Sequence, residues 1–193
     1  SAFVVGSVGA SSITDARITN FGLSFIEDTT RPTIAITDDD ADNSLSAGES
    51  STITFTLSEA STDFVEADAT VTGGELSNWT AVSSTVYTAI FTPTANSSTN
   101  AVIHVANDKF SDAAGNTNQD ENDANNTVTF TVDTTRPTIA ISSNDTSLKA
   151  GETAAITFTL SEAATDFVEA DATVTGGSLS NWTAVSSTVY TAI

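Results

Sequence analysis

The stretch TFTLSEASTDFVEADATVTGGELSNWTAVSSTVYTAI, residues 54–90, occurs twice in this chain of 193 residues. A second copy fills residues 157–193 and differs from the first at two positions, Ser61 to Ala164 and Glu75 to Ser178. The segment DTTRPTIAI at residues 28–36 likewise returns at residues 133–141. The offset of about 105 residues is long enough for a domain with its own core, whereas solenoid repeats have periods of roughly 20–50 residues. The sequence therefore predicts domains in tandem.

This period divides the chain into three parts. We predict one complete domain at residues 30–133 and the first strands of a following domain at residues 134–193. Residues 1–29 match the repeat poorly, and we interpret them as the last strands of a preceding, diverged domain, with strands at residues 2–8 and 18–27. The last residue of the chain corresponds to a position inside a predicted strand, so we expect the chain to be part of a longer protein.

Strand periodicity dominates the sequence of the complete domain. In residues 51–58 the apolar residues Ile53, Phe55 and Leu57 alternate with threonine, which gives the strand one buried and one solvated face. Seven such strands in about 100 residues, with no cysteine pair, predict an all-β fold of tandem immunoglobulin-like, seven-stranded β-sandwiches. We place the strands at residues 32–37, 51–58, 64–72, 77–82, 85–93, 101–106 and 127–133.

The charge balance narrows the choice of partners. The net charge is −20, with 25 acidic and 5 basic residues. Nucleic acid is not an expected partner, because phosphate contacts require a basic face, and direct contact with an anionic membrane is disfavoured for the same reason. The carboxylates indicate either a solubilising surface or one that takes up cations. The chain has no cysteine, so disulfides do not stabilise it, and its composition suits a bacterial cell surface.

Alternating strand directions place the loops at two ends of the complete domain. The segments 58–63 and 107–126 are expected at the end that carries the preceding linker. The segments 38–50 and 94–100 are expected at the opposite end, beside Asp133. At each joint, loops of one domain should therefore meet loops of the next.

The linker DTTRP supplies the first candidate metal site. Its proline makes a short, stiff crossing by fixing one backbone angle and restricting the residue before it. Carboxylates that converge at a joint repel one another unless a cation joins them, and Ca²⁺ accepts six to eight hard oxygens in irregular geometry. The alternative is that these side chains solvate a loop and cap its turns. The candidate ligands are Asp28, Glu59 and Asp63 at the first joint, and Asp133, Glu162 and Asp166 at the second.

A second candidate calcium site lies in residues 38–49. Its acidic residues fall at positions 1, 3, 5 and 12 of a calcium-binding loop, with Asn43 where such loops place glycine. No flanking helices are predicted, so the segment is not a complete EF-hand. The second repeat lacks the first three acids but keeps Glu152, which leaves open a structural role for the last one. The candidate ligands are Asp38, Asp40, Asp42 and Glu49.

The long polar segment 107–126 supplies a third candidate. A loop of this length in a compact domain is functional or disordered, and Asp112 and Asn116 flank a turn that could present oxygens to a cation. A cation site and a solvated loop both remain open. Catalysis has little support: the single histidine, His104, is expected on a strand, and no arrangement of nucleophile, base and acid accompanies it. We therefore expect no enzymatic activity.

Several segments resemble a known group, the bacterial Ig-like repeats of giant secreted adhesins of the RTX and biofilm types. These segments are DTTRPTIAI, LSEAxTDF, DATVTGG and FSDAAGNTN, and the resemblance covers about residues 28–193. It implies a string of β-sandwiches exported to the bacterial cell surface and stiffened by Ca²⁺ at the joints. The matching positions are those named above for the two joints. The glycine-rich nonapeptide repeats of RTX tails are absent from this sequence.

Two functions follow as hypotheses. The first is an extracellular structural extender, in which neighbouring repeats of the chain are the partners and other domains bind any surface ligand. The second is a self-assembling homopolymer, in which half-domains exchange strands between copies. A lectin-like role would need exposed aromatic side chains on a loop, whereas Trp79 and Trp182 are expected in the core or in a strand.

Overall fold

The computed structural model describes residues 27–120 and 123–193, and the account below is confined to them. Packing divides the chain into two units, Ser1–Thr30 and Arg31–Ile193. The strands predicted at residues 2–8 and 18–26 lie outside the described residues. We call residues 30–133 the first repeat and residues 134–193 the second repeat, and we describe each by itself.

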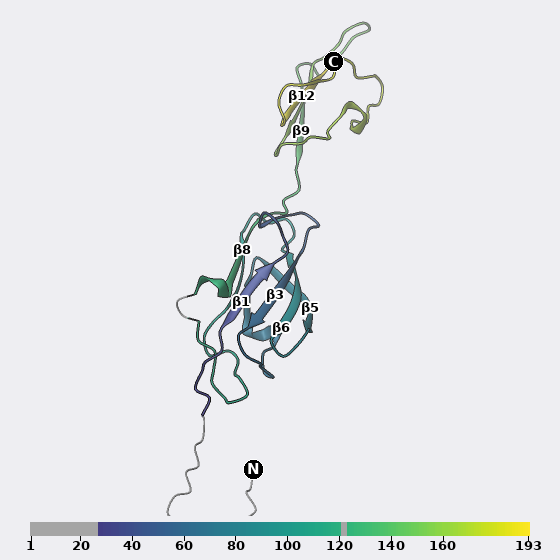
Figure 1. Ribbon diagram of the computed structural model, residues 1–193. Helices are drawn as coiled ribbons and strands as arrows, with labels where there is room; N and C mark the ends of the chain where they lie inside the picture. Colours follow the sequence, from purple (N-terminus) through teal and green to yellow (C-terminus); the bar gives the residue numbers. More distant parts are fainter. Residues whose placement is uncertain (1–26, 121–122) are drawn as a thin grey trace, which may run out of the picture. The chain divides into compact units, whose positions relative to one another are not determined.

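One sheet of the first repeat contains four antiparallel strands in the order β1-β3-β6-β5. The strands are β1 (Ile34–Asp38), β3 (Ser51–Leu57), β6 (Val86–Pro93) and β5 (Gly74–Ala81). Figure 1 shows them along one side of the domain. They correspond to the predicted strands at 32–37, 51–58, 85–93 and 77–82, with β5 beginning three residues earlier than expected.

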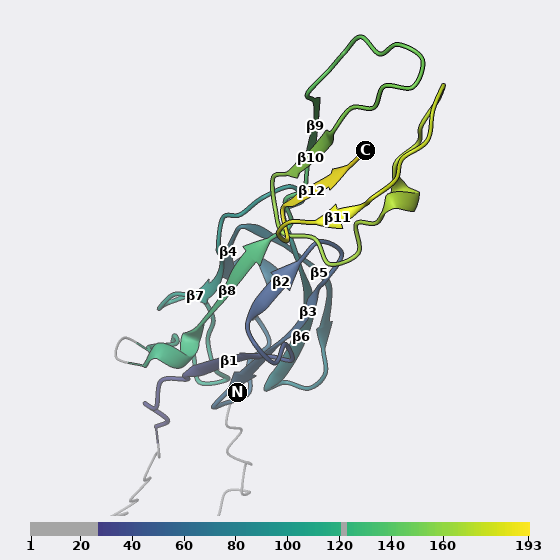
Figure 2. The same cartoon turned by 90° about the horizontal axis from the view of Figure 1, so that it is seen from above.

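The other sheet of the first repeat has the order β2-β8-β7-β4, and most of it is labelled in Figure 2. It consists of β2 (Ser44–Ser46), β8 (Thr127–Asp133), β7 (Ala101–Val105) and β4 (Ala69–Thr72). Strand β2 pairs with β8 in parallel, and the other pairs are antiparallel. Four strands facing three, with β2 as an additional edge strand, is the constant-type immunoglobulin arrangement. The predicted fold class is therefore confirmed.

The core lies between the two sheets and follows the alternation in the sequence. Ile53 and Phe55 on β3 are fully buried, and the threonines between them face outward. Ile103 on β7 and Phe130 on β8 are buried from the opposite sheet. Phe130 also stacks on Phe91 of β6, with ring centroids 5.5 Å apart, so the two sheets meet through direct side-chain contact.

Aromatic side chains from two loops extend this core towards one end of the sandwich. Phe64, in the β3–β4 loop, lies with its ring centroid 5.3 Å from that of Trp79 and 5.0 Å from those of Tyr87 and Phe110. Phe110 belongs to the β7–β8 loop. The Tyr87 hydroxyl donates a hydrogen bond to the backbone oxygen of Ser61, 3.0 Å away. Both loops are therefore fixed to the core rather than resting on it.

Two features of the first repeat differ from the predicted strands. The strand expected at 64–72 begins at Ala69, because Glu66–Asp68 form a 3-10 turn whose Asp68 carboxylate accepts the backbone N–H of Val65. Strand β2 was expected to be loop. Its three residues are too few for an alternating pattern to register, yet Leu45 is buried in the core.

The second repeat forms one sheet in the order β11-β12-β10-β9, which matches the order of the equivalent strands in the first. The strands are β9 (Ile139–Ser143), β10 (Ile156–Leu160), β11 (Thr183–Ala184) and β12 (Val189–Ala192), and Glu169–Asp171 form a 3-10 turn. The pairing of β9 with β10 and of β10 with β12 is antiparallel, as in the first repeat. The repeated sequence thus forms the same strand pairing in this sheet twice, although β11 is shorter than β5 and the segment equivalent to β4 is not a strand.

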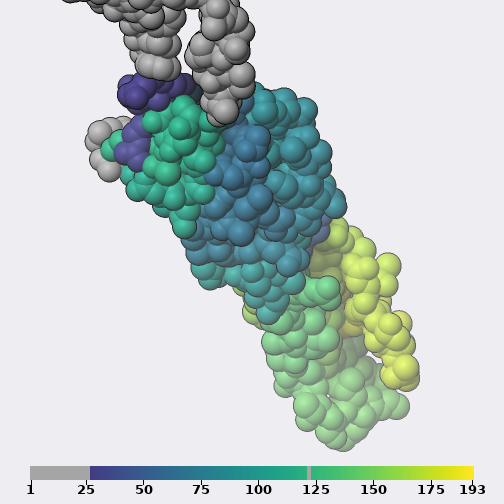
Figure 3. Space-filling view, turned by 90° about the horizontal axis from the view of Figure 1, so that it is seen from below, coloured from purple at the N-terminus to yellow at the C-terminus, as the bar shows by residue number. Residues whose placement is uncertain are grey.

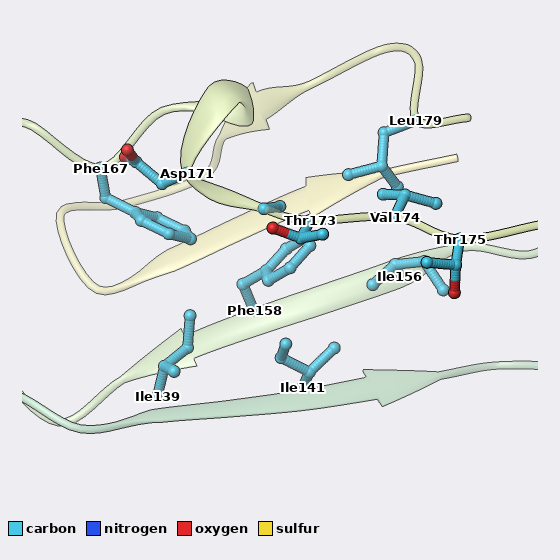
Figure 4. A pocket seen from close by; sticks show the side chains of 11 residues that line it. Ile139, Ile141, Ile156, Phe158, Phe167, Asp171, Thr173, Val174, Thr175 and Leu179 are labelled. Atoms are coloured by element: carbon cyan, nitrogen blue, oxygen red, sulfur yellow. The ribbon is translucent and has the colours of Figure 1, made fainter. Parts of the chain in front are cut away.

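In the second repeat, one face of the sheet carries exposed apolar side chains. Ile139 is 47% exposed and Ile141 is 63% exposed, whereas their counterparts Ile34 and Ile36 are 1% and 4% exposed. The face forms a groove of about 430 Å³, shown in Figure 4. Its other apolar side chains include Ile156, Phe158, Phe167, Val174 and Leu179. In the first repeat the equivalent face of the β1-β3-β6-β5 sheet is covered by the β2-β8-β7-β4 sheet.

No helix among the described residues is long and apolar enough to cross a membrane.

Candidate metal centre and the linker motif

The β7–β8 loop is built around one buried polar side chain. Asn118 is fully buried, and its side-chain oxygen accepts the backbone N–H groups of Lys109 and Phe110 at 2.6 and 3.2 Å. Its side-chain nitrogen donates to the backbone oxygen of Ala106 at 2.9 Å. These three bonds give the buried side-chain amide of Asn118 hydrogen-bond partners, and they give residues 106–118 a defined path. The described part of the loop is thus ordered by its own hydrogen bonds, and the cation site predicted there stays a prediction.

A second buried side chain joins the same loop to the first strand. The Asp120 carboxylate, 5% exposed, accepts the backbone N–H of Ile34 at 2.9 Å. The backbone N–H of Gln119 donates to the backbone oxygen of Pro32 at 3.0 Å. The loop is therefore hydrogen-bonded to the segment through which the chain enters the domain. Asn118 and Asp120 belong to the polar run of the third candidate site, but nothing in that run distinguished them as its buried members.

Asp63 ties the β3–β4 loop to the β7–β8 loop. Its carboxylate accepts hydrogen bonds from the Ser61 hydroxyl at 2.7 Å and from the backbone N–H and hydroxyl of Ser111. Burial alone would raise the pKa of Asp63, but the hydrogen bonds from Ser111 and Ser61 together hold that pKa below its ordinary value. In the second repeat Ala164 replaces Ser61, so Asp166 lacks this hydroxyl donor.

Asp112 forms a tight turn with Asn116, the residue paired with it in the sequence-based hypothesis. The Asp112 carboxylate accepts the backbone N–H groups of Ala114 and Asn116 at 2.8 and 2.9 Å, and the side-chain amide of Asn116 at 2.8 Å. The bond from the Asn116 side chain is the main reason that the pKa of Asp112 lies below its ordinary value. Asp112 is therefore a preformed, ionised group at this end of the domain.

Among the described residues, one group of three carboxylates lies close enough together that it could hold a metal ion. Asp28, Glu59 and Asp112 each offer an oxygen, and these oxygens lie within 4.8 Å of one another. The group combines two ligands predicted for the first joint with Asp112, which was assigned to a separate loop site. Asp63, the third ligand predicted there, instead makes the hydrogen bonds described above. Only the folded path of the β7–β8 loop brings Asp112 close to Glu59, so spacing in the sequence could not reveal it.

The second joint has no such group within the described residues. Asp133 accepts the backbone N–H of Thr135 at 3.2 Å, as Asp28 accepts that of Thr30 at 3.0 Å. The sequence contains counterparts of Asp28 and Glu59 here, Asp133 and Glu162, but none of Asp112. The 193 residues stop before the position that the repeat would assign to this third carboxylate, so Glu162 and Asp166 stay predicted ligands of this joint.

The acidic segment 38–49 is a chain of short turns around strand β2. Asp38 accepts the N–H of Asp40 at 3.1 Å, and Asp40 and Asp42 both accept that of Ser44, at 2.8 and 3.1 Å. Glu49 accepts the N–H of Ser46 at 2.8 Å. Asn43 has φ 54°, the left-handed conformation expected from its place in the motif. The four candidate ligands serve as turn caps here, and no three of them bring their oxygens within 4.8 Å of one another as the group at Asp28 does.

The linker arginine is a functional residue that sequence reasoning missed. Arg31 donates from Nε to the backbone oxygen of Thr117 at 2.8 Å, from Nη1 to Gln119 at 2.9 Å, and from Nη2 to the Asp108 carboxylate at 2.7 Å. The planar guanidinium presents five donors in a rigid fork, so it reaches several acceptors with less loss of side-chain freedom than the flexible ammonium of lysine. Figure 3 shows the surface of the first repeat, to which the β7–β8 loop contributes. The recurrence of this arginine as Arg136 was the available signal.

At the opposite end of the first repeat, Thr134 is bound to the β6–β7 loop. Its hydroxyl donates to the backbone oxygen of Thr94 at 2.6 Å and accepts the N–H of Ser97 at 2.9 Å. Its own N–H donates to the backbone oxygen of Ser97 at 2.9 Å, and the residue is 4% exposed. The predicted position of segment 94–100 beside Asp133 is confirmed.

The single histidine lies outside these arrangements. Its Nδ1 is 2.9 Å from the Thr127 hydroxyl, and it borders a polar hollow of about 370 Å³ with Asn107, Asp120 and Asp123. Asn107 accepts the N–H of Asp120, and Asp123 caps the 3-10 turn at residues 124–126. The polar groups around His104 are thus engaged in holding the loop.

Comparison with known proteins agrees with this architecture. The sequence profile of a bacterial Ig-like domain matches residues 28–130 and again residues 133–193. Curated protein sequences give no match. Among solved structures, the chain is similar to FdeC, described as a broadly conserved adhesin of Escherichia coli, at 18% identity and a TM-score of 0.39. That similarity covers 84% of this chain and 53% of the other, so the chain spans about half of that structure. Since the two profile matches take in more than half of the residues, the chain belongs to the bacterial Ig-like domain family.

Proposed function

We propose that this chain is a structural extender segment of a bacterial cell-surface adhesin, of the RTX or biofilm type, whose joints are stiffened by Ca²⁺. The observation that carries the proposal is the group formed by Asp28, Glu59 and Asp112. Near-identical repeats suit a spacer, because every unit performs the same task. The chain's partners are then neighbouring repeats, its location is extracellular, and adhesion itself belongs to other domains.

The repeat explains why a cation bound to this group would act at a joint. Asp133, the counterpart of Asp28, is the last residue of β8, where it pairs with Ser46. By this equivalence we expect Asp28 to adjoin a preceding domain, while Glu59 and Asp112 belong to the domain that follows. One ion would therefore connect two domains. Ca²⁺ suits the three carboxylates because it prefers oxygen ligands and completes its shell with backbone oxygens and water.

The calcium proposal predicts a large thermal effect. Because an ion at about 100 times its dissociation constant stabilises a site by about 2.7 kcal/mol, we expect millimolar Ca²⁺ to raise the melting temperature of the first repeat by about 10 °C over a chelated sample. Glu59→Gln should remove most of this rise, because it deletes one ligand charge. Scanning calorimetry with Ca²⁺, Mg²⁺ and chelator measures the effect.

The matched control for that experiment is Glu75→Ser. It also removes one negative charge from the first repeat, and it introduces the residue that the second repeat already has at this position. Its response to Ca²⁺ should equal that of the unaltered chain. Equal melting temperatures of the unaltered chain with Ca²⁺ and with chelator would contradict the proposed site.

A second candidate function, assembly by strand donation between copies, is favoured by the exposed face of the second repeat. Ile139 and Ile141 there are among the largest exposed apolar side chains of the described residues. Strands equivalent to β7 and β8 of another copy would cover them, as β7 and β8 cover Ile34 and Ile36. We expect such assembly to increase the mass measured by light scattering as concentration rises. A constant monomer mass from about 1 to 500 µM would rule it out, since specific complexes commonly form within this range.

A further inference from the structure

We propose that a joint of the repeat leaves a single residue without a bond to either domain, at the position of Thr30 and Thr135. The contacts at residues 133 and 134 in one copy of the motif, combined with those at residues 31 to 33 in the other, bond the residues on both sides of this position. The linker would then restrict bending by its own hydrogen bonds, whether or not a cation is present. This inference goes beyond the calcium proposal and does not depend on it.

The downstream half of the linker is bonded to the domain that it enters. Arg31 makes the three contacts to the β7–β8 loop described above. Pro32 is fully buried, and its backbone oxygen accepts the N–H of Gln119. The next residue, Thr33, exchanges two hydrogen bonds with Ser58, one to the hydroxyl at 2.9 Å and one from the backbone N–H at 3.0 Å. Residues 31, 32 and 33 are thus each hydrogen-bonded to the domain that follows.

The upstream half of the linker is bonded to the domain that it leaves. Asp133 lies in β8 in register with Ser46 of β2. Thr134 follows with its three hydrogen bonds to the β6–β7 loop. The first repeat therefore binds the start of the linker that leaves it, up to residue 134. It also binds the end of the linker that enters it, from residue 31.

The exact repetition of DTTRP allows the two ends to be combined into one joint. Residues 28–32 and 133–137 have the same sequence, so the contacts at residues 133 and 134 describe how the motif begins, and those at residues 31 and 32 describe how it ends. The second copy supports this: Thr138 exchanges two hydrogen bonds with Ser161, at 2.8 and 2.9 Å, as Thr33 does with Ser58. One residue remains between the two sets of contacts.

Even that residue has little freedom. Its backbone N–H is donated to the aspartate two positions earlier in both copies, from Thr30 to Asp28 and from Thr135 to Asp133. The proline that follows the arginine also restricts the arginine backbone to extended conformations. Bending at the joint must therefore be absorbed by the backbone angles of about one residue, flanked by residues that are already fixed.

Backbone ¹⁵N relaxation and amide exchange of the full chain test this inference, with and without chelator. We expect Arg31 and Thr134 to be as rigid as the neighbouring strands in both conditions. Arg31→Ala should speed exchange of the Gln119 amide by about tenfold, and Thr134→Val should do the same for the Ser97 amide, because each variant removes hydrogen bonds worth about 1–1.5 kcal/mol. Thr134→Ser keeps the hydroxyl, so the Ser97 amide of this variant should exchange at the rate measured in the unaltered chain. Exchange of the amides in β3 shows whether each variant remains folded.

The outcomes separate this inference from the calcium proposal. If Thr134 or Arg31 of the unaltered chain relaxes like a mobile loop, or if Thr134→Val and Thr134→Ser exchange alike, the single-residue joint is wrong, whatever calcium does. If both residues stay rigid under chelation while Ca²⁺ leaves the melting temperature unchanged, the linker contacts stand and the metal site falls. If Arg31 and Thr134 become mobile when chelator is added, the inference is wrong, because the stiffness of the linker would then come from the ion alone.

Discussion

Gly74→Ala is expected to lower the free energy of unfolding of the first repeat by about 3 kcal/mol, enough to leave much of it unfolded at physiological temperature. A β-carbon at this position would lie 2.3 Å from the backbone oxygen of Thr92 and 2.4 Å from the ring of Phe91. Phe91 is fully buried, so neither neighbour can move away without disturbing the core. Urea titration followed by NMR signals of the first repeat measures the loss.

The second repeat supplies a control within the same chain. Gly177 corresponds to Gly74 in the repeated stretch, but a β-carbon there would meet nothing within 4 Å. Gly177→Ala should therefore change stability by less than about 1 kcal/mol, in either direction. Equal losses from the two substitutions would mean that backbone conformation, and not the contact with Thr92 and Phe91, decides the cost.

Asn118→Ala is expected to cost about 3 kcal/mol and to disorder the β7–β8 loop. The substitution leaves the buried N–H of Phe110, the part-buried N–H of Lys109 and the backbone oxygen of Ala106 without the partners they now have. Each unsatisfied buried group costs about 1–3 kcal/mol unless water replaces the partner. Thermal unfolding measures the loss, and amide exchange across residues 106–118 locates it.

The same substitution connects the loop to the proposed metal site. If the loop positions Asp112 beside Glu59, Asn118→Ala should weaken Ca²⁺ binding although residue 118 is not a ligand. Asn100→Ala, at an exposed position of the β6–β7 loop, is the matched control and should change neither stability nor binding by more than about 0.5 kcal/mol. Unaltered loop exchange in Asn118→Ala would show that the aromatic contacts of Phe110 suffice to hold the loop.

The strands of the first repeat were predictable because their signal is local. In β3 the alternation of Ile53, Phe55 and Leu57 with threonine predicts which side of the strand faces the core, and all three of these apolar side chains are buried. Strand β2 carries no such signal. It has one buried residue, Leu45, and it exists only because β8, some 85 residues away in the sequence, offers an edge to pair with. Pairing partners at that distance cannot be read from a three-residue segment.

The sequence could predict that carboxylates gather at a joint, but it could not predict which carboxylates lie together there. The repeat of Asp28 as Asp133 pointed to the joint, and the predicted loop positions brought Glu59 to the same end. Asp63 and Asp112 were assigned to different sites by their positions in the sequence, and the fold brings both to that end. Ser111 donates to Asp63 and the turn at Asn116 presents Asp112, which are consequences of the loop's folded path.

The parallel pairing of β2 with β8 has a consequence for a molecule that is pulled. The chain enters the first repeat at one end of the sandwich and leaves it at the other, through β8. Tension along the chain therefore loads the paired residues Ser44–Thr131, Leu45–Val132 and Ser46–Asp133 in shear. The bonds along this short edge share the load and must rupture together, instead of opening one after another like a zip. Such geometry lets a weakly stable domain withstand force in the direction from which a tether would apply it.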